Sequence, residues 1–210
     1  MICSAGTLGH EMFRRALSSP SSIVVTQAML GIRGGRNVLF RDWIRVEPGA
    51  QVLDIGCGIG SLSRHLGPAV YVGADLDWRC LRHGASRYRR RASFVRCDVT
   101  RSWPFREHGF DCVFGFGVLH HLSDTQALFL LREARRMLKE GGVLYTVDPF
   151  TAEGQSWVKR GLLAMDRGEH IRPSSDYRRL VEAVFTRVSH MMSDDLLRIP
   201  YDLLMMRCQA

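Results

Sequence analysis

The stretch QVLDIGCGIGSLSRHL, residues 51–66, decides the fold, because a short apolar run leads directly into glycines at every second position. These glycines are Gly56, Gly58 and Gly60. A glycine-rich turn after a buried strand is typical of open α/β sheets, which bind ligands at the carboxyl ends of their strands. Since glycine has no Cβ, the spacing indicates that another group lies close to this backbone.

The chain around this turn alternates short apolar segments with helical ones between residues 50 and 150. Most of the apolar segments lack a strict period of two, as expected of parallel strands that are buried on both faces. Repeated strand–helix units predict a Rossmann-like, doubly wound α/β sheet with helices on both faces. We expect strands at 51–55, 70–76, 93–99, 110–115 and 143–148, and helices at 61–66, 78–88 and 125–138, with Gly141 and Gly142 ending the last helix.

The two ends of the chain have a different pattern. Residues 1–46 contain no strand candidate and predict a helical N-terminal cap or lid, whereas 47–210 form the sheet domain. Within that domain, 150–185 is mainly helical. A length of 210 residues suits one domain with a full core. Two final strands are expected near 187–192 and 201–208.

The composition is that of an ordinary globular chain, with 46% hydrophobic and 24% charged residues. No apolar run is long enough to cross a bilayer, and the first residues lack the pattern of a secretory signal. The six cysteines are scattered without a Cys-x-x-Cys pair, which argues against a zinc site and fits a reducing compartment. We therefore expect a cytoplasmic protein without a metal centre.

The formal net charge is +8, and almost all of the positive charge is arginine, because Lys139 and Lys159 are the only lysines. The densest basic run is RHGASRYRRRASFVR, from Arg82 to Arg96. Two interpretations are open: solvated arginines on a helix face, or a surface that contacts RNA. No aromatic ladder or RNA-binding signature accompanies the run, which favours solvated arginines.

The residues near the glycine turn indicate which ligand it binds. Asp75 ends the second expected strand, 19 residues after Gly56, and a carboxylate at that spacing accepts hydrogen bonds from both hydroxyls of a ribose. Ser61 stands where a dinucleotide-binding loop has its third glycine or alanine, and Asp54 places a negative charge near the turn. That charge is unfavourable beside a pyrophosphate and favourable beside a cation. S-adenosyl-L-methionine, a sulfonium nucleoside without phosphate, fits this pattern better than a nicotinamide dinucleotide.

Five segments in order carry a resemblance to a known family. VLDIGCGIG resembles the first motif of the class I S-adenosylmethionine-dependent methyltransferases, and VGADL resembles the second-strand motif that ends in the ribose-binding acid. FVRCDVT is similar to the third-strand motif, WPFREHGFDCVFGFGVLHHL to the fourth-strand block, and LREARRMLKEGGVLYTVDP to the following helix and fifth strand. The resemblance is continuous over about residues 50–149. Its nearest subgroup is the small-molecule methyltransferases, including quinone-biosynthesis-like members.

The resemblance implies a seven-stranded sheet whose last strand is antiparallel, and it implies roles for individual residues. Gly56 and Gly58 would pass under the methionine part of the cofactor, and Gly115 or Phe116 would offer backbone groups to its ammonium. Asp98 would accept the adenine amino proton. The expected cofactor-binding residues, including Val99 over the adenine face, are Asp54, Gly56, Cys57, Gly58, Gly60, Asp75, Leu76, Asp98, Val99, Gly115 and Phe116.

Methyl transfer is an in-line displacement, so positioning supplies much of the rate, and a base helps only where the acceptor holds a proton of high pKa. His120 and His121 follow the fourth strand and face the methyl donor. Either one of them orients or deprotonates the acceptor, or the pair caps the following helix or packs beneath the cofactor. The segments before 46 and within 150–185 would form the acceptor pocket. Weaker candidates for acceptor contacts are His10, Asp148, His170, Arg172, Arg178 and Arg179.

These observations favour transfer of a methyl group from S-adenosyl-L-methionine to an oxygen or nitrogen of a small-molecule metabolite, releasing S-adenosyl-L-homocysteine. One alternative is an RNA methyltransferase that uses the Arg82–Arg96 surface. Enzymes that methylate base amino groups usually carry Asn/Asp-Pro-Pro-Tyr/Phe after the fourth strand, where this chain has GFGVLHH. The other alternative is a non-catalytic scaffold that binds the cofactor.

Overall fold

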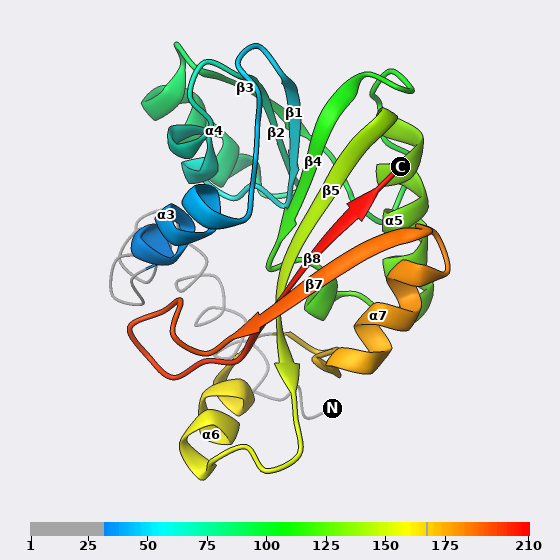
Figure 1. The fold of residues 1–210 in the computed structure, drawn as a ribbon. Coiled ribbons are helices and arrows are strands. Elements are labelled where there is room, and N and C mark those ends of the chain that lie inside the picture. The colour runs from blue at the N-terminus through cyan, green and yellow to red at the C-terminus, as the bar shows by residue number, and fades with distance from the viewer. Residues whose placement is uncertain (1–31, 167) are drawn as a thin grey trace, which may run out of the picture.

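The computed structural model describes residues 32–166 and 168–210 (Figure 1). His10 and most of the expected 1–46 cap lie outside the described residues, and the described part of that cap is helix α3. The elements in order are α3 (Ile32–Asp42), β1 (Gln51–Ile55), η1 (Ser61–His65), β2 (Val70–Asp75), α4 (Trp78–Tyr88), β3 (Ala92–Arg96), β4 (Phe110–Phe116), η2 (Leu119–His121), α5 (Asp124–Met137), β5 (Leu138–Thr151), α6 (Trp157–Met165), β6 (Arg172–Pro173), α7 (Ser174–Glu182), β7 (Arg187–Ser193) and β8 (Leu203–Gln209).

The strands form one sheet in the order β3-β2-β1-β4-β5-β8-β7. β1 to β5 are parallel neighbours, whereas β8 runs antiparallel to both β5 and β7. The predicted doubly wound sheet with an antiparallel last strand is therefore confirmed. A two-residue strand that was not expected, β6, pairs with the far end of β5 at Phe150 and Thr151.

Helices cover both faces of the sheet, as the repeated strand–helix pattern predicts. Figure 1 shows α3 and α4 on one side and α5 and α7 on the other. Each face has its own core: Leu130 of α5 and Tyr177 of α7 are buried in one cluster, and Leu39 of α3 and Leu62 of η1 in the other. The central strands β1, β4 and β5 are buried on both faces, which explains their missing alternation.

The long helix ends one residue before the expected position 138, but the expected stop signal is wrong. Gly141 and Gly142 do not stop α5; the helix ends at Met137, and both glycines lie inside β5. Leu138 already has extended dihedrals and pairs with Phe110, and the ladder shifts register before Cys112. Gly141, at φ 73°, allows that irregularity. Glycines in such a bulge and glycines after a helix look alike in sequence.

Two smaller differences lie near the glycine turn. The segment expected as a helix at 61–66 is a 3₁₀ turn, η1. The third strand ends at Arg96 instead of residue 99, because the Asp98 carboxylate accepts hydrogen bonds from the backbone N–H and the hydroxyl of Thr100 and turns the chain there.

Candidate functional site

The residues expected to bind the cofactor meet at the carboxyl edge of the sheet. Asp54 lies near the end of β1, whose neighbours are β2 and β4, and the glycine turn follows that end. Asp75 is the last residue of β2 and pairs with Arg96 at the end of β3. Gly115 lies near the end of β4. The parallel register thus brings four separate sequence motifs to one edge.

The three glycines of the turn have different reasons for lacking a side chain. All three have positive φ, between 54° and 70°, a region that favours glycine. A Cβ at Gly56 would lie 2.7 Å from Cγ2 of Val118, and one at Gly60 would lie 2.5 Å from the Phe94 ring. A Cβ at Gly58 would meet nothing within 4 Å. Two glycines are therefore required by the protein's own packing, and Gly58 is the one that faces open space.

Asp75 joins this turn to β2. Its Oδ2 accepts a hydrogen bond from the Gly58 N–H at 2.7 Å, and its Oδ1 accepts one from the Asp77 N–H at 2.9 Å. Each oxygen of an ionised carboxylate has two acceptor positions, so each keeps one after these bonds. Two fixed oxygens with a free acceptor position apiece suit the paired hydroxyls of a ribose. Leu76, beside them, is 57% exposed.

Asp54 was expected to carry a full negative charge, but its surroundings in the fold favour the neutral form. Its side chain is buried, and its Oδ2 accepts a hydrogen bond from the Tyr71 hydroxyl at 2.5 Å. Burial raises the pKa of Asp54 to about 7, although the Tyr71 hydrogen bond and the positive charge of Arg36 act in the opposite direction. The carboxyl is therefore divided between neutral and ionised forms near neutral pH, and a bound cation would favour the ionised one.

Asp98 is held in its ionised form. Its Oδ1 accepts both hydrogen bonds from Thr100, and its Oδ2 lies 3.3 Å from Nε of Arg101. The Thr100 hydrogen bonds, with the charge of Arg101, hold the pKa of Asp98 below its ordinary value. An ionised carboxylate is an acceptor suited to an amino group such as that of adenine. The next residue, Val99, is half-buried against the core.

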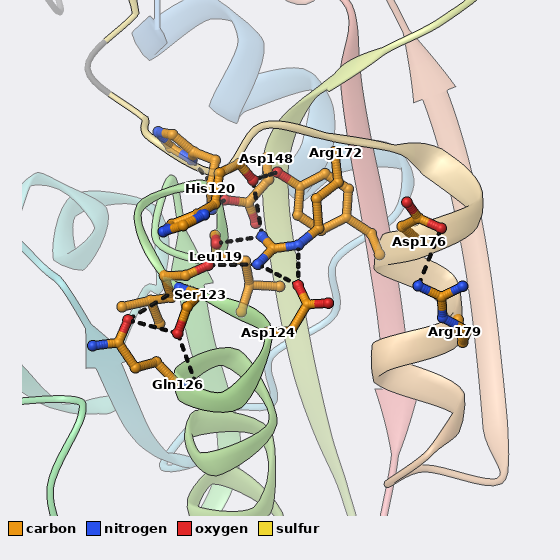
Figure 2. Close-up of polar contacts among 12 residues, drawn as sticks. Leu119, His120, Ser123, Asp124, Gln126, Asp148, Arg172, Asp176 and Arg179 are labelled. Atoms are coloured by element: carbon orange, nitrogen blue, oxygen red, sulfur yellow. Dashed lines mark hydrogen bonds and ion pairs between the residues drawn. The ribbon is translucent and has the colours of Figure 1, made fainter.

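His120 lies at the centre of a buried ionic cluster at the same edge (Figure 2). Its Nδ1 lies 2.8 Å from Oδ1 of Asp148 in β5, and its Nε2 lies 3.4 Å from Oδ1 of Asp166, which follows α6. Tyr201 donates a hydrogen bond to the other Asp166 oxygen at 2.5 Å. Burial alone would lower the pKa of His120, but the two carboxylates outweigh it and raise this pKa to about 9. The imidazole is consequently protonated at neutral pH.

The same cluster fixes the chain that follows α6. The His170 N–H donates a hydrogen bond to the His120 carbonyl at 2.9 Å, and a Cβ at Gly168 would lie 2.2 Å from Cδ2 of His120. His121 is exposed, and its ring centroid lies 4.0 Å from that of His120. The two neighbouring histidines thus have opposite surroundings, which the sequence did not distinguish.

Arg172 is occupied by the protein itself (Figure 2). Its guanidinium is buried and bonds Asp124 at 2.8 Å and the carbonyls of Leu119, His170 and Leu122 at 2.5–3.0 Å. These bonds use donors on all three guanidinium nitrogens. Arg172 therefore anchors η2 and the start of α5 to β6. Its guanidinium donates to these protein groups, so nothing in its contacts supports a role in binding the acceptor.

The other arginines named for the acceptor lie on α7. Arg179 pairs with Asp176 at 3.4 Å, and Arg178 pairs with Glu182 at the same distance. Both pairs are local contacts along the helix, in the i,i+3 and i,i+4 spacings.

Asp166 and Tyr201 were not identified from the sequence. They lie 35 residues apart, and each is distant in the chain from His120. Neither belongs to a motif with a recognisable spacing, so no signal in the sequence pairs them.

In the described part of the chain, no helix is both long enough and apolar enough to cross a membrane.

We call the carboxyl edge of the sheet around the turn at residues 56–60 the glycine edge. Its hydrogen-bond acceptors and open glycines fit S-adenosyl-L-methionine. Gly58 and Gly115 leave space for a ligand against the backbone, since a Cβ at either would meet nothing within 4 Å. Asp75 offers two fixed oxygens, and Asp98 offers an ionised one. These carboxylates match the hydroxyl and amino donors of a nucleoside, and the ionised form of Asp54 beside the turn would repel a pyrophosphate.

Comparisons with known proteins agree with this chemistry. Residues 52–142 match the family model described as "Methyltransferase domain". A 24-methylenesterol C-methyltransferase 2 of Oryza sativa subsp. japonica is 27% identical over 138 residues, which are 62% of this chain and 35% of the relative. A probable tRNA methyltransferase 9B of Homo sapiens is 33% identical over 99 residues, 47% of this chain and 21% of the relative. The chain spans about a third or less of the length of these two relatives.

A solved structure supports the fold across nearly the whole chain. The phosphoethanolamine N-methyltransferase 2 of Haemonchus contortus, in complex with S-adenosyl-L-methionine, superposes with a TM-score of 0.75 at 15% identity. The superposition covers 95% of this chain and 59% of the other. Residues 52–142 thus match a methyltransferase-domain family model, and the sheet topology is that of the solved methyltransferase structure.

Proposed function

We propose that this protein transfers a methyl group from S-adenosyl-L-methionine to an oxygen or nitrogen of a small-molecule metabolite. The observation that carries the proposal is the arrangement of Asp75 and Gly58: a carboxylate fixed by two backbone N–H groups beside an open glycine. The cofactor supplies an electrophilic methyl group on its sulfonium. The chain's own residues bind it, orient it and present the acceptor in line with it.

Each residue of the glycine edge has a role in this proposal. Asp75 accepts hydrogen bonds from the ribose hydroxyls, and Asp98 accepts one from the adenine amino group. Gly58 and Gly115 let the backbone approach the methionine part, whose positive charge favours the ionised form of Asp54. Cys57, Leu76, Val99 and Phe116 complete the walls of the binding site.

The two histidines divide the acceptor side between them. His120 is protonated and held by two carboxylates, so it has no vacant lone pair with which to act as a base at neutral pH. We assign it the role of a positioning residue, which fixes the segment from Asp166 to His170 beside η2. His121, which is exposed at the same edge, is assigned to contact with the acceptor.

A small-molecule acceptor has more support than a nucleic acid among the relatives. Two of the three names above, 24-methylenesterol C-methyltransferase and phosphoethanolamine N-methyltransferase, contain a small acceptor, and one contains a tRNA. These names include both carbon and nitrogen as the methylated atom, so they do not select the atom for this chain.

Isothermal titration calorimetry with S-adenosyl-L-methionine, S-adenosyl-L-homocysteine and NAD tests the cofactor part of the proposal. We expect the first two to bind and NAD not to bind. At 100 times its Kd, a ligand that binds only the folded state should add about 2.7 kcal/mol to the free energy of unfolding. Replacing Asp75 with alanine should weaken binding at least about tenfold by removing the ribose contacts.

The matched control is Glu140→Ala, which removes an exposed carboxylate near the start of β5, at the edge of the sheet opposite to Asp75. It changes net charge by the same amount and should leave the affinity unchanged. Equal affinity in Asp75→Ala and the natural protein would remove Asp75 from the ribose role. Failure of both S-adenosyl compounds to bind would refute the proposed function.

A further inference from the structure

A surface hollow far from the glycine edge is lined by arginines from two separate segments. It has a volume of about 560 Å³. Arg64 of η1 contributes from one side, and the end of α4 with the following turn contributes from the other. The lining residues are Arg64, Ser86, Arg87, Tyr88, Arg89, Arg90 and Arg91.

The strand register places this hollow at the opposite edge of the sheet from the candidate active site. Asp75 is the last residue of β2, and α4 starts just after it and ends at Tyr88. The turn 89–91 leads into Ala92, which pairs with Tyr71 near the start of β2. Since Asp75 and Tyr71 lie at opposite ends of one strand, the hollow is separate from the site proposed for the cofactor.

The described residues around the hollow do not balance its positive charge. No acidic residue is among the described residues that line it. Among the ion pairs between described residues, none includes any of the five lining arginines. A helix C-terminus favours cations within its last turn, which accounts for Arg87 and Arg89. It does not account for Arg64, Arg90 and Arg91, whose exposed guanidinium groups repel one another weakly through water, a repulsion that a bound anion would offset.

The number of arginines indicates what kind of anion fits. A single phosphate accepts one bidentate arginine well and has room for few more, whereas five guanidinium groups match several phosphates at successive positions. A chain of phosphodiesters supplies such an array. The open, concave shape of the hollow suits a flexible strand that follows the surface.

Helix α4 extends this basic surface toward the cofactor edge. The guanidinium of Arg82 lies 4.5 Å from the centroid of the Trp78 ring, and Trp78 is 49% exposed. Eleven helical residues span about 16 Å, the length of two or three nucleotides of an extended strand. An arginine stacked on an exposed ring, continuous with a row of arginines outside any ion pair of the described chain, is the combination that binds single-stranded nucleic acid through stacking and phosphate contacts.

We propose that the α4 surface, from Trp78 to the arginine hollow at 87–91, binds single-stranded RNA through its phosphodiester backbone. The five lining arginines contact phosphates, and Trp78 with Arg82 forms a platform on which a base stacks. This inference concerns a binding surface and goes beyond the proposed methyl transfer. It does not depend on the identity of the methyl acceptor.

Fluorescence anisotropy with a labelled oligouridylate of about fifteen nucleotides, measured over a series of salt concentrations, tests the inference. The hollow variant is Arg87→Gln/Arg89→Gln/Arg90→Gln/Arg91→Gln. Affinity should fall at least about tenfold, and the salt slope should flatten by about 0.7 for each phosphate that the variant no longer neutralises. Trp78→Ala should weaken binding about tenfold and leave the salt slope unchanged, because stacking releases no counterions.

The matched control is Arg106→Gln/Arg132→Gln/Arg187→Gln/Arg198→Gln, which replaces four exposed arginines elsewhere and changes the net charge equally. It should retain the salt slope of the natural protein and most of its affinity. Far-ultraviolet circular dichroism and thermal melting check that each variant is folded. If the hollow variant does not fold, Arg90→Gln/Arg91→Gln in the turn replaces it.

Three results would overturn the inference. Equal reductions of affinity in the hollow and control variants would mean that net charge alone attracts the RNA. Binding of inorganic tripolyphosphate that the oligouridylate does not displace would assign the hollow to a small anion. Hollow-dependent binding to vesicles of phosphatidylglycerol, with none to the oligouridylate, would assign it to a membrane surface.

Discussion

The acidic side chains at the carboxyl edge of the sheet have two opposite kinds of surroundings. Among the described residues, Asp75 accepts hydrogen bonds from two backbone N–H groups and keeps acceptor positions beside the open Gly58. Asp148 and Asp166 are bonded by the charged imidazole of His120. Asp75 can therefore accept hydrogen bonds from a ligand, whereas Asp148 and Asp166 join β5, η2 and the segment after α6. Shared location at the functional edge of a sheet is therefore insufficient to assign a ligand role.

The largest expected effect comes from breaking the His120 cluster. His120→Ala leaves the buried Asp148 without its cation, so the free energy of unfolding should fall by about 3–5 kcal/mol. Urea unfolding at neutral pH measures the change. His190→Ala, on the exposed face of β7, is the control and should change stability by less than about 0.5 kcal/mol. A decrease of less than about 1 kcal/mol in His120→Ala would show that the cluster does not hold the edge together.

The glycine turn should separate stability from binding. Gly60→Ala puts a Cβ into the Phe94 ring at a φ of 70°, and we expect it to lower the free energy of unfolding by about 2–4 kcal/mol. Gly58→Ala has only the cost of its positive φ, about 1–2 kcal/mol, because its Cβ meets no protein atom.

Gly58→Ala should nevertheless weaken S-adenosyl-L-methionine binding the more strongly of the two. Thermal melting and calorimetry on both variants test the two effects together. The opposite ranking, with Gly60→Ala stable and Gly58→Ala unfolded, would contradict the packing explanation.

The pH dependence of stability should report the state of His120. Its pKa in the folded protein is about 9, above the ordinary value of 6.5. A histidine whose pKa is raised by folding stabilises the protein fully below its unfolded pKa, and that contribution disappears as pH rises through the folded pKa. We expect a decrease on the order of 2 kcal/mol between pH values of about 6.5 and 9. Urea unfolding across this range should show it, and His120→Gln should lack it.

A smaller effect in the same direction is expected at Asp54. Its folded pKa of about 7 lies above the ordinary 3.8, so ionisation of the buried group costs stability as pH rises through that interval. Asp54→Asn keeps an acceptor for Tyr71 and removes the charge. The free energy of unfolding should rise by about 1–2 kcal/mol near pH 8 and change little near pH 4.

Cofactor affinity should fall in Asp54→Asn although stability rises, because the variant lacks the negative charge that favours a sulfonium nucleoside. Calorimetry at about pH 8 measures it. A variant that is stabilised and binds S-adenosyl-L-methionine with full affinity would show that Asp54 serves only as a partner for Tyr71.

The sequence was sufficient for what depends on short spacings. The order of strands and helices, the glycine turn at the end of β1 and Asp75 at the end of β2 all follow from local patterns, and the structure confirms their positions. Spacing alone, however, gives only the need for glycine and not the group that approaches it. For Gly56 and Gly60 that group is a side chain of the protein.

The His120 cluster was beyond the reach of the sequence for a different reason. Its members come from η2, β5, the end of α6 and the approach to β8, and no periodicity relates positions so far apart. The ionisation of Asp54 has the same limit, because it depends on burial beside Tyr71 and Arg36. Charge at a buried site is a property of the folded protein that residue type alone does not give.

The position of β8 has a consequence for biosynthesis. β7 leaves the ribosome before β8 and pairs in the sheet with β8 alone. When β7 has just been made, β5 also lacks its neighbour on that side, and the five parallel strands stand with an open edge. A nascent chain that has emerged only as far as the segment between Ser193 and Leu203 would therefore expose the edge of β5 that faces β8, together with a β7 that has nothing to join.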